Sequence, residues 1–371
     1  MENKNKLFKV VIKYLVIIII CIFACFLLIF PKEVSNSIIK SINSCFIIVI
    51  PSLYAFIVIS NILVKTNIYM ILSKPFYLIS RYLFRIPPEL FSIFILSSIG
   101  GYPVGAKLIS ELVNEGKIDN KTAENMMCYC YCNSPAFFAG AIGMSIFGNS
   151  NIGLIVYLSV LISNIIIAIC IGAKQKLPKK VKIKIKIKLN ANIIIDSINS
   201  GYKTITMICF MLVFFSVIIC FCDITGITNI ITKIIGNIFN DITIYKASVD
   251  SIIEISQISY LEKNCYFLLP IISGIASFGG LCVILQIISL TFGIIKLKKF
   301  WISRIFSAII SAIICYLFNV SLLYDANIQT SFISNRIFLS ERSFISSICL
   351  IIMSFILLFL KKDRFYKKGM L

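Results

Sequence analysis

Histidine is absent from this chain of 371 residues, and charged residues make up only 14% of it. Without histidine the chain lacks the most common metal ligand and proton relay. A chain with so few charges also has too little polar surface for a soluble globular domain. Its residues are 59% hydrophobic and its mean hydropathy is +0.96. We therefore predict an all-α polytopic membrane protein.

Acidic residues are scarce as well, at 16 against 36 lysines and arginines, which gives a net charge of +20. The lysines lie between apolar runs, and the chain has no soluble domain to present them to a nucleic acid. Short cytoplasmic loops of membrane proteins carry such an excess. The run VKIKIKIK within Lys174 to Lys188 is expected to rest on lipid headgroups, although its alternation also fits a two-faced strand. We predict membrane lipid, and no nucleic acid, as a partner.

The fourteen cysteines are scattered through apolar runs, so they predict buried thiols and no disulfide framework. Cys128, Cys130 and Cys132 alternate with tyrosines, and on a helix Cys128 and Cys132 would share one face. Two thiols without histidine or acidic neighbours make a poor metal site. The chain also has no nucleotide-binding loop. We predict no metal, no cofactor and no enzymatic activity.

Helix-breaking residues interrupt the apolar runs at two places in the first half of the chain. Apolar stretches of about ten residues flank the first interruption, and each is too short to cross a bilayer core of ~30 Å. They predict a re-entrant hairpin over about 88–115. The run over 122–147 is long enough to span, but proline interrupts it, so it predicts a broken helix. The interrupting residues are Gly100, Gly101, Tyr102 and Pro103 in the hairpin, and Asn133, Ser134 and Pro135 in the broken helix.

The same order of parts recurs in the second half. A span is followed by an interfacial stretch, a short hairpin over about 245–263 and a broken helix over 264–294. The hairpin is interrupted at Glu254, Ser256 and Gln257, and the helix at Ser277, Gly279 and Gly280. Counting the spans places the two copies in opposite orientations, so we predict inverted repeats. The predicted parts are an N-terminal span (1–36), the first repeat (37–175), a basic cytoplasmic loop (176–200), the second repeat (201–321), and a last span with a basic tail (322–371), with both termini cytoplasmic.

Irregular backbone at membrane depth is tolerated only where it is buried in protein or lines a wet cavity. The interruptions therefore point to the substrate site of a transporter. Ser134 and Pro135 match a helix start whose free amides could hold an anion, although a simple proline kink would give the same pattern. Gly279 and Gly280 either admit a ligand close to the backbone or allow tight helix packing.

Two charged residues belong to the same predicted site. Glu254 lies in a short apolar segment, where a carboxylate is costly, so it either faces a cavity or a partner or lies near the outer interface. Lys107 either faces the substrate or pairs with Glu111, one helical turn further along. The candidate substrate-binding residues are Gly100, Gly101, Tyr102, Pro103, Lys107, Asn133, Ser134, Pro135, Glu254, Ser256, Gln257, Ser277, Gly279 and Gly280.

Three segments carry a family resemblance: GGYPVGAKLISELVNEGKI, CNSPAFFAGAIG and ASFGGLCVILQ. They resemble the YlbJ family of sporulation integral membrane proteins, over about residues 45–320. The predicted architecture is similar to that of the gate proteins of nucleoside recognition and the concentrative nucleoside transporters. One departure is IIEISQIS, where the family tends to have FEMTLGAK. This chain keeps the acidic residue as Glu254 and lacks the glycine and the lysine.

The resemblance implies a transporter in the outer forespore membrane that helps deliver dipicolinic acid, a small dicarboxylate, to the spore. A small anionic substrate is therefore the expected partner, and the sequence leaves a coupling ion and a homo-oligomer open. One alternative is a membrane scaffold of spore assembly that transports nothing, since fold does not guarantee function. Another is a nucleoside or cation carrier.

Overall fold

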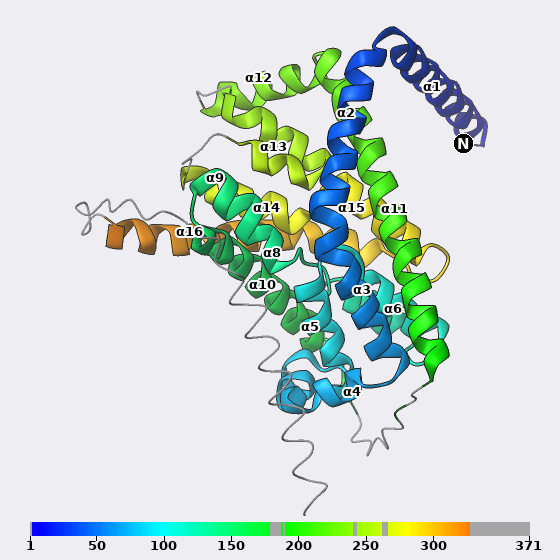
Figure 1. Cartoon of the computed structure of the whole chain (residues 1–371), viewed down its shortest axis with the longest axis vertical. Helices are drawn as coiled ribbons and strands as arrows, with labels where there is room; N and C mark the ends of the chain where they lie inside the picture. The colour runs from blue at the N-terminus through cyan, green and yellow to red at the C-terminus, as the bar shows by residue number, and fades with distance from the viewer. Residues whose placement is uncertain (1, 179–186, 188–189, 240–242, 262–265, 327–371) are drawn as a thin grey trace, which may run out of the picture. The chain divides into compact units, whose positions relative to one another are not determined.

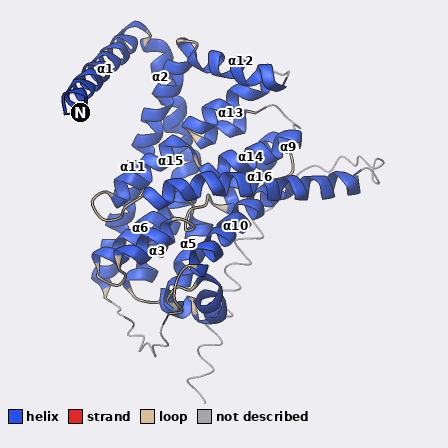
Figure 2. Cartoon of the chain, turned by 180° about the vertical axis from the view of Figure 1, so that it is seen from behind, coloured by secondary structure: helices blue, strands red, loops and turns tan. Residues whose placement is uncertain are grey.

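The computed structural model describes residues 2–178, 187, 190–239, 243–261 and 266–326. Every regular element in these residues is helical, and Figure 2 draws no strand among them. The all-α prediction is confirmed. The chain divides into two units, residues 1–322 and 323–371, and the first is described below. The alternating lysines at 182–188 and the predicted C-terminal span lie outside the described residues.

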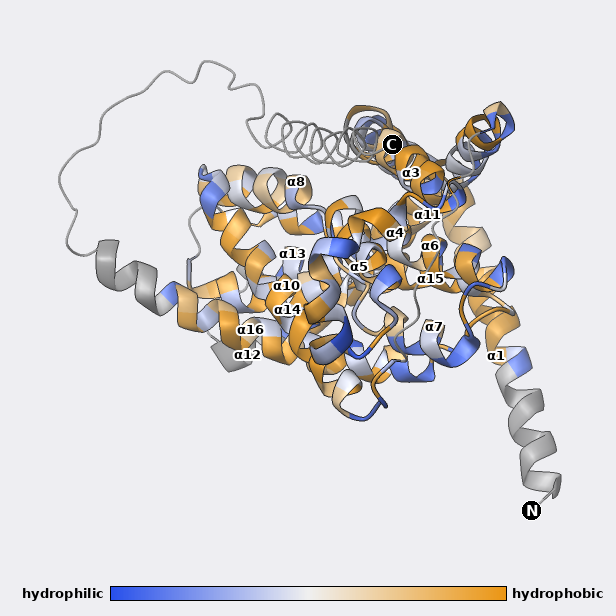
Figure 3. Cartoon of the chain, turned by 90° about the horizontal axis from the view of Figure 1, so that it is seen from below, coloured by the Kyte–Doolittle hydropathy of each residue, from blue (hydrophilic) through white to orange (hydrophobic). Residues whose placement is uncertain are grey.

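Four described segments are long and apolar enough to cross a membrane. They are α10 (Ser150–Ala173), α11 (Ala191–Ile224), the segment Tyr266–Thr291 and the first part of α16 (Lys298–Ala326). A fifth is possible where α1 (Glu2–Ile29) meets α2 (Pro31–Ser44), if Lys13–Ile29 and Pro31–Ile47 are counted as one span bent by 93°. Pro31 begins α2, where its missing N–H costs no helical bond. In Figure 3 most of the coloured helical ribbon is hydrophobic, and hydrophilic residues gather at turns and near α7.

After α2 the helix continues through a π-helical turn, Cys45–Val49, into α3 (Ile50–Lys65). The wider turn accommodates Pro51, which would otherwise clash with the preceding turn. Residues 68–84, which precede the first hairpin, form a series of short turns and not one helix. They contain α4 (Tyr69–Leu72), a 3₁₀ turn at Lys74–Phe76 and a π-helical turn at Ile79–Phe84. A further 3₁₀ turn, Pro88–Leu90, leads into the hairpin.

The predicted first hairpin consists of α5 (Phe91–Gly100) and α6 (Tyr102–Asn114), joined at Gly101. Gly101 has a φ of 93°, which side chains other than glycine rarely adopt. A Cβ atom on Gly105 would lie 2.8 Å from the Cβ of Ser97. These two residues stand four places on either side of Gly101, so the two arms fold back on each other.

The predicted broken helix is present, but its break is longer than the sequence indicated. Helix α7 (Asn120–Met127) ends well before the proline, and residues 128–134 are not helical. The helix resumes as α8 (Pro135–Phe137), a π-helical segment (Phe138–Met144) and α9 (Ser145–Phe147). Since Cys128 and Cys132 lie in the non-helical stretch, the prediction that they share a helical face is wrong.

The second half follows the predicted order, and its hairpin has a shorter return arm. Helix α12 (Ile227–Phe239) precedes α13 (Thr243–Ile253), and the chain returns from α13 as a 3₁₀ turn, Ile255–Tyr260. After a 3₁₀ turn at Tyr266–Leu268, α14 (Leu269–Phe278) and α15 (Gly280–Thr291) meet at the predicted interruption. Helix α11 begins ten residues before the predicted boundary at 201. The inverted orientation of the repeats stays a prediction.

The first hairpin, the first break and helices α10, α14 and α15 share one buried core. Helix α10 packs on the Phe138–Met144 segment, where Gly153 lets the two backbones meet. Helix α11 packs along α2 and α3, and α15 packs against α6 (Figure 1). This arrangement places both helix breaks inside the bundle.

Candidate functional site

The first break ends at Ser134 and Pro135, which start the following helix as predicted. The Ser134 hydroxyl oxygen accepts a hydrogen bond of 3.2 Å from the amide of Phe137, and Pro135 occupies the first turn. The Asn133 side-chain oxygen accepts one of 2.9 Å from the amide of Ser134. The N-cap is confirmed. Two of the amides expected to be free are therefore already engaged by the neighbouring side chains.

The tip of the first hairpin lies on the first break. A Cβ on Gly101 would lie 3.7 Å from the side-chain oxygen of Asn133 and 3.8 Å from the amide of Ser134. Gly100 packs under the Phe56 ring, which a side chain would strike. Tyr102 and Pro103 are buried in the first turn of α6. The structure thus brings both predicted groups of the first half together.

The second half repeats this contact. Gly279 and Gly280 have φ angles of 89° and 77°, so the chain turns sharply between α14 and α15. A Cβ on Gly280 would lie 3.1 Å from the carbonyl oxygen of Ser251 and 3.3 Å from that of Ile252, at the end of α13. The tip of the second hairpin therefore lies on the second break.

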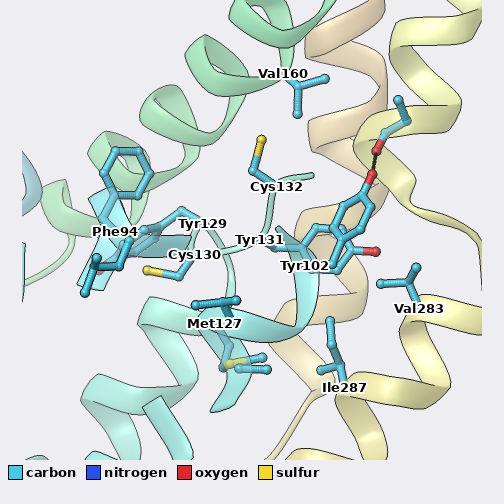
Figure 4. Close-up of a cluster of buried hydrophobic side chains, with 14 of the residues drawn as sticks. Phe94, Tyr102, Met127, Tyr129, Cys130, Tyr131, Cys132, Val160, Val283 and Ile287 are labelled. Atoms are coloured by element: carbon cyan, nitrogen blue, oxygen red, sulfur yellow. Dashed lines mark hydrogen bonds between the residues drawn. The ribbon is translucent and has the colours of Figure 1, made fainter. Parts of the chain in front are cut away.

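Two tyrosines, one from the first break and one from the first hairpin, bond to the last turn of α14 before the second break. The Tyr131 hydroxyl, from the first break, donates a hydrogen bond of 2.9 Å to the carbonyl of Phe278, beside Gly279. The Tyr102 hydroxyl donates to the carbonyl of Ala276 on α14. Figure 4 shows the two rings side by side, and their centroids are 4.6 Å apart. The four predicted interruptions thus converge on one buried junction.

Sequence reasoning missed Arg304, a buried cation at this junction. Its side chain is 0% exposed, and it is the only charged residue between Lys299 and Asp325. Its Nη2 donates to the carbonyl of Cys128 in the first break and, over 3.3 Å, to the side-chain oxygen of Asn164 on α10. A charged residue inside an apolar segment is usually functional, and Glu254 was selected above on this ground. By the same criterion Arg304 could have been selected from the sequence.

Two aromatic rings lie against this cation, and Asn164 makes a further hydrogen bond to the first break. The guanidinium lies 4.7 Å from the centroid of the Tyr131 ring and 5.5 Å from that of Phe300. The Asn164 amide nitrogen donates to the carbonyl of Tyr131 over 2.8 Å. Arg304 and Asn164 therefore satisfy two backbone carbonyls of the first break, at Cys128 and Tyr131.

Hydroxyl pairs extend the polar junction along α16. The predicted residue Ser277 lies 2.6 Å, oxygen to oxygen, from Ser307 on α16. Ser307 also lies 3.0 Å from the hydroxyl of Ser163 on α10. Further along, the hydroxyls of Ser273 and Ser311 are 2.5 Å apart. Hydrogen bonds between helices of this kind stabilise packing inside membranes.

Glu254 is buried at the tip of the second hairpin, with 4% of its surface exposed. One carboxylate oxygen accepts a 3.0 Å bond from the amide of Ser256, and the other accepts from the Ser256 hydroxyl. The amide of Gln257 donates to the Glu254 carbonyl over 3.1 Å. One turn earlier, Asp250 is 6% exposed, and its Oδ1 has no hydrogen-bond partner among the described residues. Sequence reasoning also missed Asp250.

Comparison with known proteins now bears on this arrangement. No family model matches the chain, and no solved structure matches it. The sporulation integral membrane protein YlbJ of Bacillus subtilis (strain 168) is 22% identical over an alignment of 299 residues, and the match covers 72% of this chain and 72% of YlbJ. This similarity supports the assignment of the chain to the YlbJ family, as a distant relative. With its apolar helices, this makes it an integral, multi-pass membrane protein.

Lys107 makes its contacts outside the junction. It pairs with Glu111 at 3.7 Å, as the spacing predicted. Its Nζ also donates to the hydroxyl of Thr204 over 2.6 Å and to the carbonyl of Ser200 over 3.3 Å, both on α11. The structure thus ties Lys107 to α11. Whether any candidate residue contacts a substrate stays a prediction.

Proposed function

We propose that this protein is a secondary transporter that moves a small dicarboxylate, dipicolinic acid, across the outer forespore membrane during sporulation. One observation carries the proposal. The two helix breaks meet inside the bundle, where Tyr131 of the first bonds to the Phe278 carbonyl of the second. The tip of a hairpin also lies against each break. Gly101 of the first hairpin contacts the first break, and Ser251–Ile252 of the second hairpin contact the second break.

Irregular backbone is expensive inside a membrane, because each unpaired peptide group costs several kcal/mol in lipid. The second break interrupts Tyr266–Thr291, a segment apolar enough to cross the bilayer. A protein that needed only to span could have used an unbroken helix there. Discontinuous helices that meet near the middle of the bundle are how secondary transporters build substrate and ion sites.

The family resemblance and the chemistry of the junction support the proposed substrate class. The B. subtilis relative is named as a sporulation integral membrane protein. The junction offers hydrogen-bond donors for an anion, namely the hydroxyls of Ser163, Ser277 and Ser307 and the guanidinium of Arg304. Dipicolinate is a rigid ring with a carboxylate at each side. Its two ends would each meet one break.

Uptake into proteoliposomes tests this function. Vesicles that contain the purified protein and unlabelled dipicolinate should take up labelled dipicolinate by exchange, at a rate that saturates with concentration. Vesicles without protein are the control. Uptake of labelled uridine without uptake of dipicolinate would identify a nucleoside carrier. Uptake of dipicolinate, nucleosides and cations no faster than in empty vesicles would identify a scaffold.

A sporulating strain gives the matching test in cells. The strain would lack its own YlbJ and would carry the chain described here. It should restore dipicolinate to its spores, measured by terbium fluorescence after heat release. Restored spore assembly without restored dipicolinate would contradict transport and favour the scaffold.

A further inference from the structure

We propose that Arg304 is the anchor of a carboxylate-binding site, in which its free N–H groups hold one carboxylate of a small organic anion. The site consists of Arg304 on α16, the carbonyl of Cys128, Asn164 on α10 and the hydroxyl of Ser307. The choice of dipicolinate as probe rests on the proposed function. The carboxylate chemistry rests on the structure alone.

The first step is the charge. Arg304 is 0% exposed, and no carboxylate of the described residues pairs with it. The ion pairs of the described chain are instead made by Lys107, Lys117, Lys246 and Lys299. An isolated cation taken out of water loses its hydration, and neutral partners restore only part of that loss. The buried guanidinium therefore favours the arrival of an anion.

The second step is the unused hydrogen-bonding capacity. Nη2 donates to two neutral oxygens, the Cys128 carbonyl and the Asn164 amide. The Nε and Nη1 atoms are buried and have no hydrogen-bond partner among the described residues. Guanidinium nitrogens can only donate, so these N–H groups need an acceptor. A carboxylate supplies both the acceptor oxygens and the negative charge.

The third step is preorganisation. The Tyr131 ring lies against the guanidinium, with the charged carbon 4.7 Å from its centroid. Asn164 is itself fixed, because its amide donates to the carbonyl of Tyr131. One helical turn after Arg304, the hydroxyl of Ser307 lies 3.4 Å from the Asn164 side-chain oxygen. These contacts fix the guanidinium before a ligand arrives, which lowers the entropic cost of binding.

The fourth step is access. A ligand reaches a fully buried side chain only if the surrounding parts move. The contacts around Arg304 come from the first break, α10 and α16, and the Tyr131 hydroxyl continues to the second break. A carrier that works by alternating access opens first to one side of the membrane and then to the other. Between these two states its substrate site is closed to both sides, as the site around Arg304 is here. We expect slow binding that follows the opening of the breaks.

Thermal unfolding of the full chain in detergent tests the site. The probes are dipicolinate and its neutral diamide, which has the same ring but no charge. A ligand that binds the folded state raises the melting temperature with its concentration. The wild type should be stabilised by the diacid and not by the diamide. Arg304→Met should lose the diacid-dependent rise, and Arg304→Lys should need at least ten times more diacid, since lysine lacks the planar fork.

Lys299→Gln is the matched control, because it removes one positive charge from the same helix. Lys299 pairs with Glu124 at 3.4 Å and donates to Asn125, outside the site. This variant should respond to the diacid as the wild type does. An unchanged diacid response in Arg304→Met would overturn the proposal and make Arg304 a structural link between α16 and the first break. If Arg304→Met does not fold, an unchanged response in Arg304→Lys would overturn it equally.

The uptake assay separates this site from the proposed function. If wild type and Arg304→Met exchange dipicolinate equally well, the transporter stands and the site is refuted. If the wild type exchanges no dipicolinate but is stabilised by it only when Arg304 is present, the site stands and transport is refuted. A wild type stabilised equally by diacid and diamide would refute a carboxylate site.

Discussion

The first break runs through seven residues, Cys128–Ser134, and none of them is glycine, whereas the second turns at Gly279 and Gly280. In the first, the carbonyls of Cys128 and Tyr131 are met by side chains from other helices, Arg304 and Asn164. In the second, the change of direction comes from backbone angles that glycine adopts without strain. The first break therefore depends on its tertiary partners, and the second depends on its own residue types.

The largest effect should come from the second break. Gly280→Val places a β-branched side chain at a φ of 77°, against the Ser251 and Ile252 carbonyls. Strain and overpacking together should lower the free energy of unfolding by about 2–5 kcal/mol. Uptake of dipicolinate should be lost while inserted protein remains. The control Gly140→Val has nothing within 4 Å of its Cβ and should unfold as the wild type does. Equal melting temperatures for both variants would mean that the glycine turn is not required.

The next effect should come from the partners of the first break. Asn164→Ala removes the donor to the Tyr131 carbonyl and the acceptor for Arg304, and leaves both groups buried. Unsatisfied buried groups of this kind cost about 2 kcal/mol. The melting temperature in detergent should fall accordingly. Asn151→Ala changes an exposed residue of the same helix and should have no effect. A wild-type melting temperature in Asn164→Ala would show that the break stands without its partners.

A smaller effect is expected where the breaks meet. Tyr131→Phe removes the hydroxyl that bonds to the Phe278 carbonyl but keeps the ring under Arg304. The loss of one buried hydrogen bond should lower the free energy of unfolding by about 1 kcal/mol. Tyr316→Phe, at an exposed tyrosine of α16, is the control and should be neutral. If both variants melt alike, the bond between the breaks adds nothing to stability.

The smallest effect concerns the helix start after the first break. Ser134→Ala removes the cap on the Phe137 amide, which should cost about 0.5–1 kcal/mol. Ser145→Ala changes a serine of the same segment that caps nothing, and should cost less. Thermal unfolding of the two variants, compared with wild type, measures the difference. If Ser134→Ala lowers the free energy of unfolding as much as Asn164→Ala does, the conformation of the first break depends on its own cap and not on contacts from other helices.

The two breaks also differ in how well the sequence predicted them. The turn at Gly279 and Gly280 was predicted at the right residues, because glycines in an apolar run signal it directly. The first break was predicted at Asn133–Pro135 but begins at Cys128. Nothing in the run Cys128 to Cys132 opposes a helix locally. Its unwinding depends on Arg304 and Asn164, which lie far away in the chain and close in space.

Composition and the length of the apolar runs determined that the chain is a helical membrane protein, since a long continuous apolar run satisfies its backbone in a bilayer by forming a helix. Local residue types determined the hairpin turn at Gly101, the cap at Ser134 and the second break, because steric and hydrogen-bonding rules act over a few residues. Only the tertiary structure decided that the hairpin tips lie on the breaks, that Lys107 turns to α11 and that Arg304 is the cation at the junction. These outcomes depend on contacts between helices, and the spacing of residues along one chain does not encode which face of a helix meets which neighbour.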